Sequence, residues 1–170
     1  MERFDYDRED IACYREMIRQ FVVPVVAEIY EKQRNRLGID HLYYYDEDMS
    51  SPEGNAIPYG TTEEQVQLAQ KMYHELSKET GEFFDFMVQH QLFDLETKPG
   101  KMQGGYCTFL PDMMAPFIFS NFNRTSADVD VLTHEAGHAF EAYTATRKGV
   151  PDEIAFSTSE VAEIHSMSME

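Results

Sequence analysis

The amino-acid sequence predicts a mainly α-helical chain with a small β-element of about two short strands. Apolar residues recur at helical spacing through most of the 170 residues, and two aromatic, β-prone segments follow the breaker pair Pro99 and Gly100. The length is enough for one ordinary hydrophobic core, and the sequence contains no repeat, linker or low-complexity tract. We therefore expect residues 1–170 to form a single domain.

The first helical region covers residues 8–36, where apolar side chains recur three or four positions apart. Pro24 lies inside this region and lacks the N–H that a helix interior uses, so we expect two helical stretches or one kinked helix. Gly38 is expected to end it. Residues 39–60 are rich in turn formers, which predicts a long surface segment.

A second helical region begins at Thr61 or Thr62, either of which can act as the N-cap while Glu64 or Gln65 completes a capping box. The region continues to about residue 92, and Gly81 is its expected interruption. Two short strands are predicted beyond the breaker pair, at Gly104–Leu110 and Ala115–Phe122.

Two more helices are expected in the last third of the sequence. The first begins at a cap formed by Thr125 or Ser126 and ends near residue 149. The second carries the capping-box pair Ser157 and Glu160 and is still helical at the last residue. These two helices contain the residues that point to a chemical function.

Composition and charge exclude several classes of function. No apolar run approaches the roughly 20 residues of a membrane span, and the first residues resemble no signal or transit peptide, so we expect a cytoplasmic protein with no membrane partner. The formal net charge of −17 would repel phosphate backbones, which argues against a nucleic-acid partner. Cys13 and Cys107 form no C-x-x-C pair, which fits a reducing compartment. Nothing in the sequence predicts an oligomeric state.

The stretch "THEAGHAFEAY" contains an H-E-x-x-H motif. His134 and His138 are four residues apart and therefore lie on one face of a helix, where both imidazoles can point at one ion. Glu135 lies about 100° further around the helix, as a general base beside a metal site requires. A motif this short also arises by chance, and the histidines could then be ordinary helix residues of a structural or interaction domain.

A third ligand must come from outside this motif. The metzincin pattern H-E-x-x-H-x-x-G-x-x-H is excluded, because Glu141 stands where glycine is needed and Thr144 where histidine is needed. Glu141 shares a face with His134 and His138, but catalytic zinc sites usually draw their ligands from separate elements. We therefore interpret Glu141 as a surface residue or a neighbour of the ligands.

The next helix offers a row of carboxylates. Glu160, Glu163 and Glu170 share one of its faces, whereas His165 lies roughly opposite Glu163. One of these glutamates can complete a His2Glu zinc site, and another can hold a zinc-bound imidazole through its free N–H. Spacing alone does not choose among the three, and a solvated helix face would show the same row.

The segments "PFIFSNFNRTSADVDVLTHEAGHAFEAY" and "SEVAEIHSMSME" resemble the oligoendopeptidase F and thimet oligopeptidase family of zinc metallopeptidases. The resemblance extends upstream through "LFDLETKPGKMQGGYCTF" and more loosely to "RLGIDHLYYYD". It implies one Zn2+ ion held by His134, His138 and Glu163, with Glu135 as the catalytic carboxylate. Glu160 and Glu170 remain as candidates for holding a ligand in place.

The resemblance further implies a zincin-like helical catalytic domain that hydrolyses short peptides held in a deep channel. Family members are several times longer, and a downstream segment with tyrosine and histidine stabilises the oxyanion. We therefore expect this chain to be a partial domain that, in isolation, binds zinc weakly or not at all and has little activity. A peptide substrate can pair with a strand edge. The residues expected to form that edge are Phe117, Ile118, Phe119, Ser120 and Asn121.

Two alternatives to an endopeptidase remain open at this point. A zinc carboxypeptidase can carry a related H-E-x-x-H helix and would trim C-termini rather than cut internally. A non-catalytic helical domain would use none of these side chains for chemistry.

Overall fold

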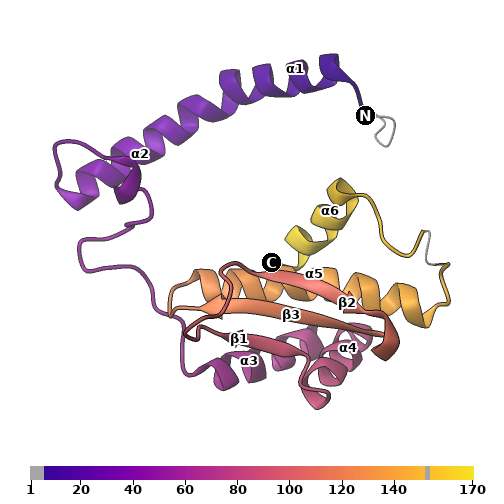
Figure 1. Ribbon diagram of the computed structural model, residues 1–170. Coiled ribbons are helices and arrows are strands. Elements are labelled where there is room, and N and C mark those ends of the chain that lie inside the picture. Colours follow the sequence, from indigo (N-terminus) through magenta and orange to yellow (C-terminus); the bar gives the residue numbers. More distant parts are fainter. Residues whose placement is uncertain (1–5, 152–153) are drawn as a thin grey trace. The chain divides into compact units, whose positions relative to one another are not determined.

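The protein was analysed as a computed structural model that describes residues 6–151 and 154–170. The chain divides into two compact units, Met1–Asn55 and Ala56–Glu170 (Figure 1). The boundary falls inside the turn-rich segment 39–60, which the sequence predicts to lie at the surface. The prediction of a single domain over residues 1–170 stays a prediction, and each unit is described by itself.

The N-terminal unit is built on a kinked helix. It consists of α1 (Arg8–Met17), a π-helical turn (Ile18–Val22) and α2 (Val23–Leu37). Pro24 lies in the first turn of α2, where its missing N–H costs little, and the wider π-helical turn precedes it. Gly38 ends α2 with a left-handed backbone (φ +69°). The predicted kink and the predicted stop are both confirmed.

The C-terminal unit begins with two helices, α3 (Thr62–Leu76) and α4 (Lys78–Gln89). The Thr61 hydroxyl accepts the backbone N–H of Glu64, and the Glu64 carboxylate accepts the backbone N–H of Thr61. The predicted capping box is therefore confirmed with this pair of residues.

The break between these two helices lies at Ser77 rather than at Gly81. Ser77 has an extended backbone, and its hydroxyl accepts the N–H of Thr80 at the start of α4. Gly81 lies inside α4, where an added Cβ would be 2.6 Å from Nδ1 of His74 on α3. The prediction that Gly81 interrupts the helix is wrong, because this glycine allows the close approach of the two helices.

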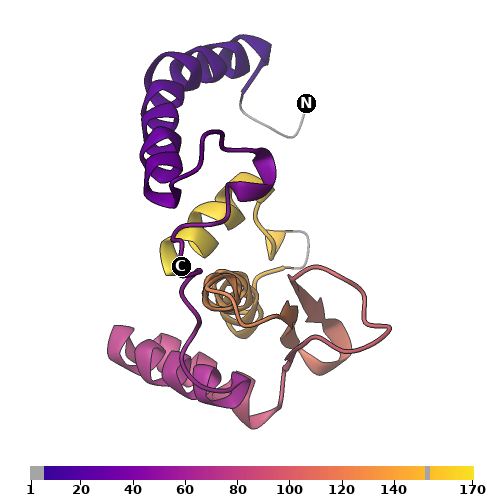
Figure 2. The same ribbon diagram turned by 90° about the vertical axis from the view of Figure 1, so that its left-hand side faces the viewer.

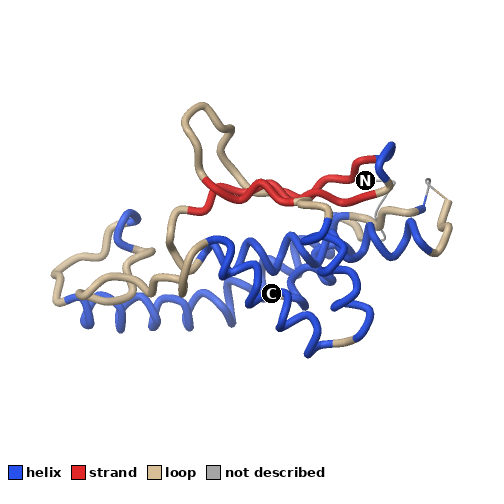
Figure 3. Tube along the Cα trace, turned by 90° about the horizontal axis from the view of Figure 1, so that it is seen from below, coloured by secondary structure: helices blue, strands red, loops and turns tan. Residues whose placement is uncertain are grey.

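Three strands form one sheet in the order β1-β3-β2 (Figure 1), and Figure 3 shows the strands together in red. They are β1 (Phe93–Glu96), β2 (Tyr106–Leu110) and β3 (Ala115–Phe122). β1 pairs with β3 in parallel, and β2 pairs with β3 antiparallel. The two predicted strands and the mainly helical character are confirmed, whereas the first strand was not predicted.

The central position of β3 corrects one expectation about the substrate. The residues expected to form a sheet edge, Phe117 to Asn121, lie in the middle strand. The N–H of Ile118 donates to the carbonyl of Leu92 on one side, and Ile118 lies opposite Cys107 on the other. The prediction of an edge at Phe117–Asn121 is wrong because its backbone already has neighbouring strands on both sides. The edges belong to β1 and β2.

The last two helices are α5 (Ala127–Arg147) and α6 (Ser159–Met169). Figure 2 looks along α5 and shows α6 on one side of it, with the sheet and the α3–α4 pair on other sides. The core beneath α5 is aromatic and aliphatic, and its largest fully buried members are Tyr73, Phe83, Phe84, Met87 and Ile118. No described helix is long and apolar enough to cross a membrane.

Helix α5 begins at one of the two predicted cap residues, whereas the start of α6 differs from the prediction. Ser126 is the N-cap residue of α5, but in the described chain its side chain makes no capping hydrogen bond. The buried carboxylate of Asp128 instead accepts the N–H groups of Asn123 and Arg124 in the preceding turn. Helix α6 begins after Thr158, so the predicted capping box that starts at Ser157 is wrong.

Candidate metal centre

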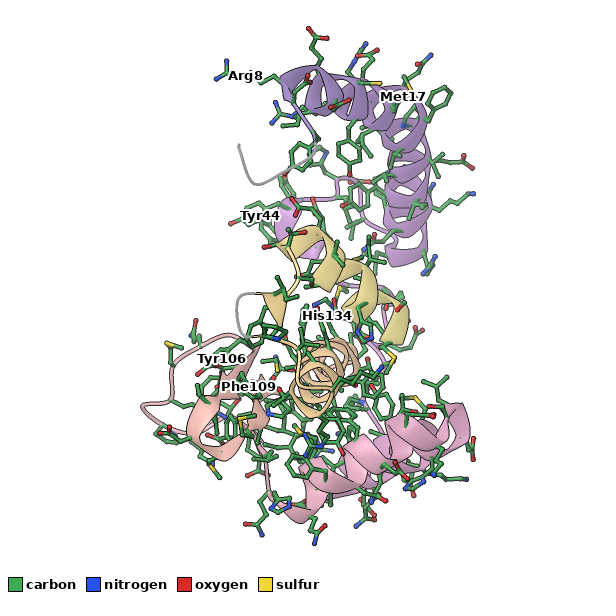
Figure 4. The ribbon with its side chains drawn as sticks, turned by 90° about the vertical axis from the view of Figure 1, so that its right-hand side faces the viewer. Arg8, Met17, Tyr44, Tyr106, Phe109 and His134 are labelled. Carbon is green, nitrogen blue, oxygen red and sulfur yellow. The ribbon has the colours of Figure 1, made fainter. Side chains whose placement is uncertain are left out.

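Helix α5 has one buried face and a second face that carries the two motif histidines. Leu132, Ala136 and Ala139 are almost fully buried in the core. The side chains of His134 and His138 keep 25% and 21% of their surface exposed, and Figure 4 shows His134 on the side of α5 that faces α6. The helix is therefore anchored by its apolar residues and presents its imidazoles to the next helix.

Helix α6 completes the cluster with Glu163. Nε2 of His134 lies 3.2 Å from one Glu163 carboxylate oxygen, and Nε2 of His138 lies 3.6 Å from the other. The two imidazole rings meet edge to face, with their centroids 4.9 Å apart. Among the described residues, His134, His138 and Glu163 bring three possible ligand atoms within 4.8 Å of one another.

This arrangement fits a zinc ion in both chemistry and spacing. Two imidazoles and one carboxylate form one of the ligand sets of catalytic zinc, which keeps a further position open. Ligand atoms bound about 2.0–2.2 Å from a tetrahedral ion lie about 3.3–3.6 Å from each other. The observed nitrogen-to-oxygen distances of 3.2 and 3.6 Å are close to that spacing. Each histidine is therefore spaced from Glu163 as two ligands of one ion would be.

The carboxylate of Glu170 contacts the other ring nitrogen of His134. Its carboxylate lies 3.3 Å from Nδ1, while Nε2 of the same ring faces Glu163. A carboxylate on the distal nitrogen fixes the tautomer and the orientation of a metal-binding imidazole. The geometry thus gives Glu170 the position expected of such a partner. Glu160 lies in the first turn of α6 and is outside the group of three ligand atoms.

Glu135 is buried beside the cluster, with only 9% of its surface exposed. Burial raises the pKa of its carboxyl, whereas the neighbouring His138 and His134 and a backbone hydrogen bond from Cys107 lower it. The net direction is upward. A carboxyl group in this position holds a proton more tightly than a solvated glutamate does.

The cysteine beside Glu135 is protonated at neutral pH. Burial, together with the charge of Glu135, raises the pKa of the Cys107 thiol to about 12. Because the thiolate is the nucleophilic form, Cys107 is poorly suited to nucleophilic chemistry. Its backbone interacts with the Glu135 carboxylate.

Two polar residues near the motif lie away from the cluster. His165 stacks on Phe140 with ring centroids 5.9 Å apart, and within the described chain its buried Nδ1 has no hydrogen-bond partner. Glu141, Phe140 and His165 help to line a separate cavity of about 350 Å³. Glu141 is not among the three clustered ligand residues.

Sequence reasoning missed Ser166, which is completely buried between α5 and α6. Its hydroxyl lies 3.1 Å from a carboxylate oxygen of Glu163. The available signal was Gly137 inside the histidine motif, because a glycine within a helix often marks the close approach of another backbone.

The sequence pattern that defines Peptidase family M3 matches residues 2–170. The chain belongs to peptidase family M3. This membership confirms the resemblance to the oligoendopeptidase F group. The M3 chain is 50% identical to a protein of Bacillus anthracis strain Ames named as an oligoendopeptidase F, with a TM-score of 0.93 over 98% of this chain. It is 49% identical to PZ peptidase A, solved with an inhibitor, also with a TM-score of 0.93 over 98% of this chain.

A more distant structure, named as a peptidase of Chlamydophila abortus, is 25% identical to the M3 chain and has a TM-score of 0.56. The M3 chain covers 85% of its own length and 24% of the other chain in that comparison. It spans 30% of the Bacillus anthracis protein and 30% of PZ peptidase A. No curated protein matches the sequence.

Proposed function

We propose that this chain carries the metal-binding centre of a zinc-dependent oligoendopeptidase that hydrolyses short peptides. The observation that carries the proposal is the convergence of two imidazoles from α5 and one carboxylate from α6, with ligand atoms within 4.8 Å. Membership of peptidase family M3 supports the reaction class. In this proposal His134, His138 and Glu163 hold one zinc ion, and Glu170 orients His134.

Zinc held by these residues supplies Lewis acidity, which lowers the pKa of water to near 7 and polarises a peptide carbonyl. Glu135 supplies the base: its carboxylate takes a proton from the attacking water and later passes it to the leaving amine. A base works best when its pKa lies near the working pH, and burial moves the pKa of Glu135 upward from that of a solvated carboxyl. The buried position also keeps bulk water away from the proton.

The edge of β2 is the better candidate for pairing with an extended substrate. Directly opposed residues of an antiparallel pair point their backbone groups either toward each other or both away. Since the N–H of Ile118 points to Leu92, the backbone of its partner Cys107 points outward, and so does that of Phe109 two residues later. Pro116, opposite Phe109, has no N–H to offer.

A peptide could therefore add as a strand along β2 and pair with the outward-pointing backbone N–H and carbonyl of Phe109. The backbone of Cys107 interacts with Glu135, so this edge passes beside the proposed base. The substrate would then lie beside both the base and the metal ligands, because α5 carries all three motif residues. In this proposal β2 takes the place of Phe117–Asn121 as the strand that pairs with the substrate.

The proposal is tested in the natural full-length protein by measuring zinc content and cleavage of a short peptide with both ends blocked. We expect Glu135→Gln to keep zinc and lose cleavage, and His138→Ala to lose zinc. His90→Ala, at an exposed histidine at the end of α4, serves as the control and should change neither. Unchanged zinc content in His138→Ala would refute the metal assignment.

The blocked peptide also distinguishes an endopeptidase from a carboxypeptidase, since a carboxypeptidase needs a free C-terminus. Cleavage only after the C-terminus is unblocked would contradict an endopeptidase. The cytoplasmic location, and the absence of nucleic-acid and membrane partners, stay predictions.

A further inference from the structure

Helices α5 and α6 touch through backbone at Gly137. A Cβ added to Gly137 would lie 2.6 Å from Cα of Ser166 and 3.3 Å from its carbonyl oxygen. Ser166 is completely buried at this contact. The missing side chain of Gly137 therefore lets α6 lie close enough for Glu163 to reach the histidines of α5.

The Ser166 hydroxyl has two acceptors within reach, both on Glu163. Its Oγ lies 3.1 Å from the backbone carbonyl oxygen and 3.1 Å from carboxylate oxygen Oε2. A hydroxyl has one proton to donate, and a charged carboxylate is the stronger acceptor. The same Oε2 lies 3.2 Å from Nε2 of His134. The serine therefore contacts the oxygen that faces the first histidine of the motif.

Glu163 gains from such support because about half of its side chain is exposed and is not packed in one position. About half of its side-chain surface, 49%, is accessible to solvent. A glutamate in this setting loses rotamer freedom when it is held in one position. The Ser166 hydroxyl lies on the same helix, one turn later, and is held in place by the contact with Gly137.

We propose that Ser166 is a positioning residue of the metal centre, which orients Glu163 through its hydroxyl and is itself placed by Gly137. The inference rests on the proposed function, because it assumes that Glu163 is a zinc ligand. It adds a role for the glycine in the motif: Gly137 sets the distance between the two helices that supply the ligands.

The test compares Ser166→Ala with Ser168→Ala in the natural full-length protein. Ser168 is exposed on the same helix and donates its hydroxyl to the carbonyl of His165, so it controls for losing a helix hydroxyl. Zinc affinity is measured by competition with a chromogenic chelator, and unfolding of the metal-free proteins by circular dichroism. We expect Ser166→Ala to weaken zinc binding about 10- to 100-fold, as loss of a ligand-orienting partner does, and Ser168→Ala to match the wild type.

Equal zinc affinity in the two serine variants would overturn the inference. So would a Ser166→Ala protein that unfolds more easily without metal but binds zinc as tightly as the wild type, since that is the signature of a packing role. His138→Ala separates this failure from failure of the proposed function. If that variant loses zinc while Ser166→Ala does not, only the serine assignment falls. A wild type that binds no zinc overturns both.

Discussion

Replacing Gly137 with alanine sets two effects of opposite sign against each other. Within a helix, alanine is intrinsically more stable than glycine by about 1 kcal/mol. The new Cβ would, however, lie 2.6 Å from Cα of Ser166, where an ordinary contact begins at 3.4 Å. The helices must therefore separate by about 0.4–0.8 Å, the difference between 2.6 Å and the 3.0–3.4 Å of tight but observed contacts.

The steric clash should outweigh the gain in helix propensity, because the obstructing atom, Cα of Ser166, belongs to the backbone. Overpacking of a tight contact costs about 1–3 kcal/mol, which exceeds the gain in helix propensity. A displacement of about 0.4–0.8 Å of α6 is also two to four times the roughly 0.2 Å tolerance of metal–ligand distances. We expect Gly137→Ala to lower the free energy of unfolding and to weaken zinc binding more than Ser166→Ala does.

The matched control is Gly81→Ala, at the close contact of α3 with α4. There the nearest atom is Nδ1 of His74, also at 2.6 Å, in a side chain that is 51% exposed, and the nearest backbone atom, Cα of His74, is further away at 3.1 Å. We expect a smaller loss of stability and wild-type zinc affinity. Thermal unfolding and chelator competition of both variants provide the measurement. A Gly137→Ala protein with wild-type zinc affinity would refute the reasoning about helix separation.

Three further predictions concern the same centre. Glu135→Gln should lower kcat about 10²- to 10⁴-fold at unchanged zinc content, which is the usual contribution of a general base; a variant with near-wild-type kcat would exclude Glu135 from this role. Glu170→Gln should weaken zinc binding about 10- to 100-fold through the loss of the carboxylate on Nδ1 of His134, and chelator competition should reveal it; unchanged affinity would leave Glu170 as a surface residue. The isolated 170-residue chain should bind zinc weakly or not at all and show little peptidase activity; a stable, active preparation would contradict this expectation.

Part of the candidate site was predictable because its information is local. The H-E-x-x-H motif singles out His134, Glu135 and His138, the helical period puts the two histidines on one face, and α5 places both on the same partly exposed face. The choice of Glu163 over Glu160 and Glu170 was different. Spacing along α6 left all three open, and the resemblance to a peptidase family selected one of them. The geometry then separates Glu163 and Glu170 by the nitrogen of His134 that each contacts.

Strand order was not predictable, because it depends on contacts between residues far apart in the sequence. β1 has only four residues, two of them acidic, so no β-pattern distinguished it from a loop. Its parallel pairing with β3 places β3 in the centre and converts an expected edge into a buried strand. The two helical glycines show a related difficulty. Gly81 and Gly137 both serve close packing, although a glycine in a helix pattern equally predicts an interruption.

Helix α6 packs on α5 with few fully buried side chains, so we expect its docking to depend on the metal. Of the residues of α6, only Ser166 is fully buried, whereas Val161, Ile164 and Met167 are 53%, 70% and 65% exposed. Its other contacts with α5 include the stacking of His165 on Phe140, the packing of Met169 beside Gly137, and the contacts of Glu163 and Glu170 with the histidines. With Glu135 added, three carboxylates then share a small region, and their mutual repulsion is unfavourable unless a cation is bound.

Removing zinc should therefore loosen α6 much more than α5. A ligand that binds only the docked state stabilises that state in proportion to its concentration and affinity, and a helix with few buried apolar contacts opens at low free energy. We expect hydrogen exchange at residues 159–169 to accelerate when a chelator is added to the natural full-length protein. Exchange along the buried face of α5, which Leu132 and Ala139 anchor in the core, should change little. Equal acceleration in both helices would mean that zinc stabilises the whole unit rather than the docking of α6, and unchanged exchange in α6 would show that its attachment does not depend on the metal.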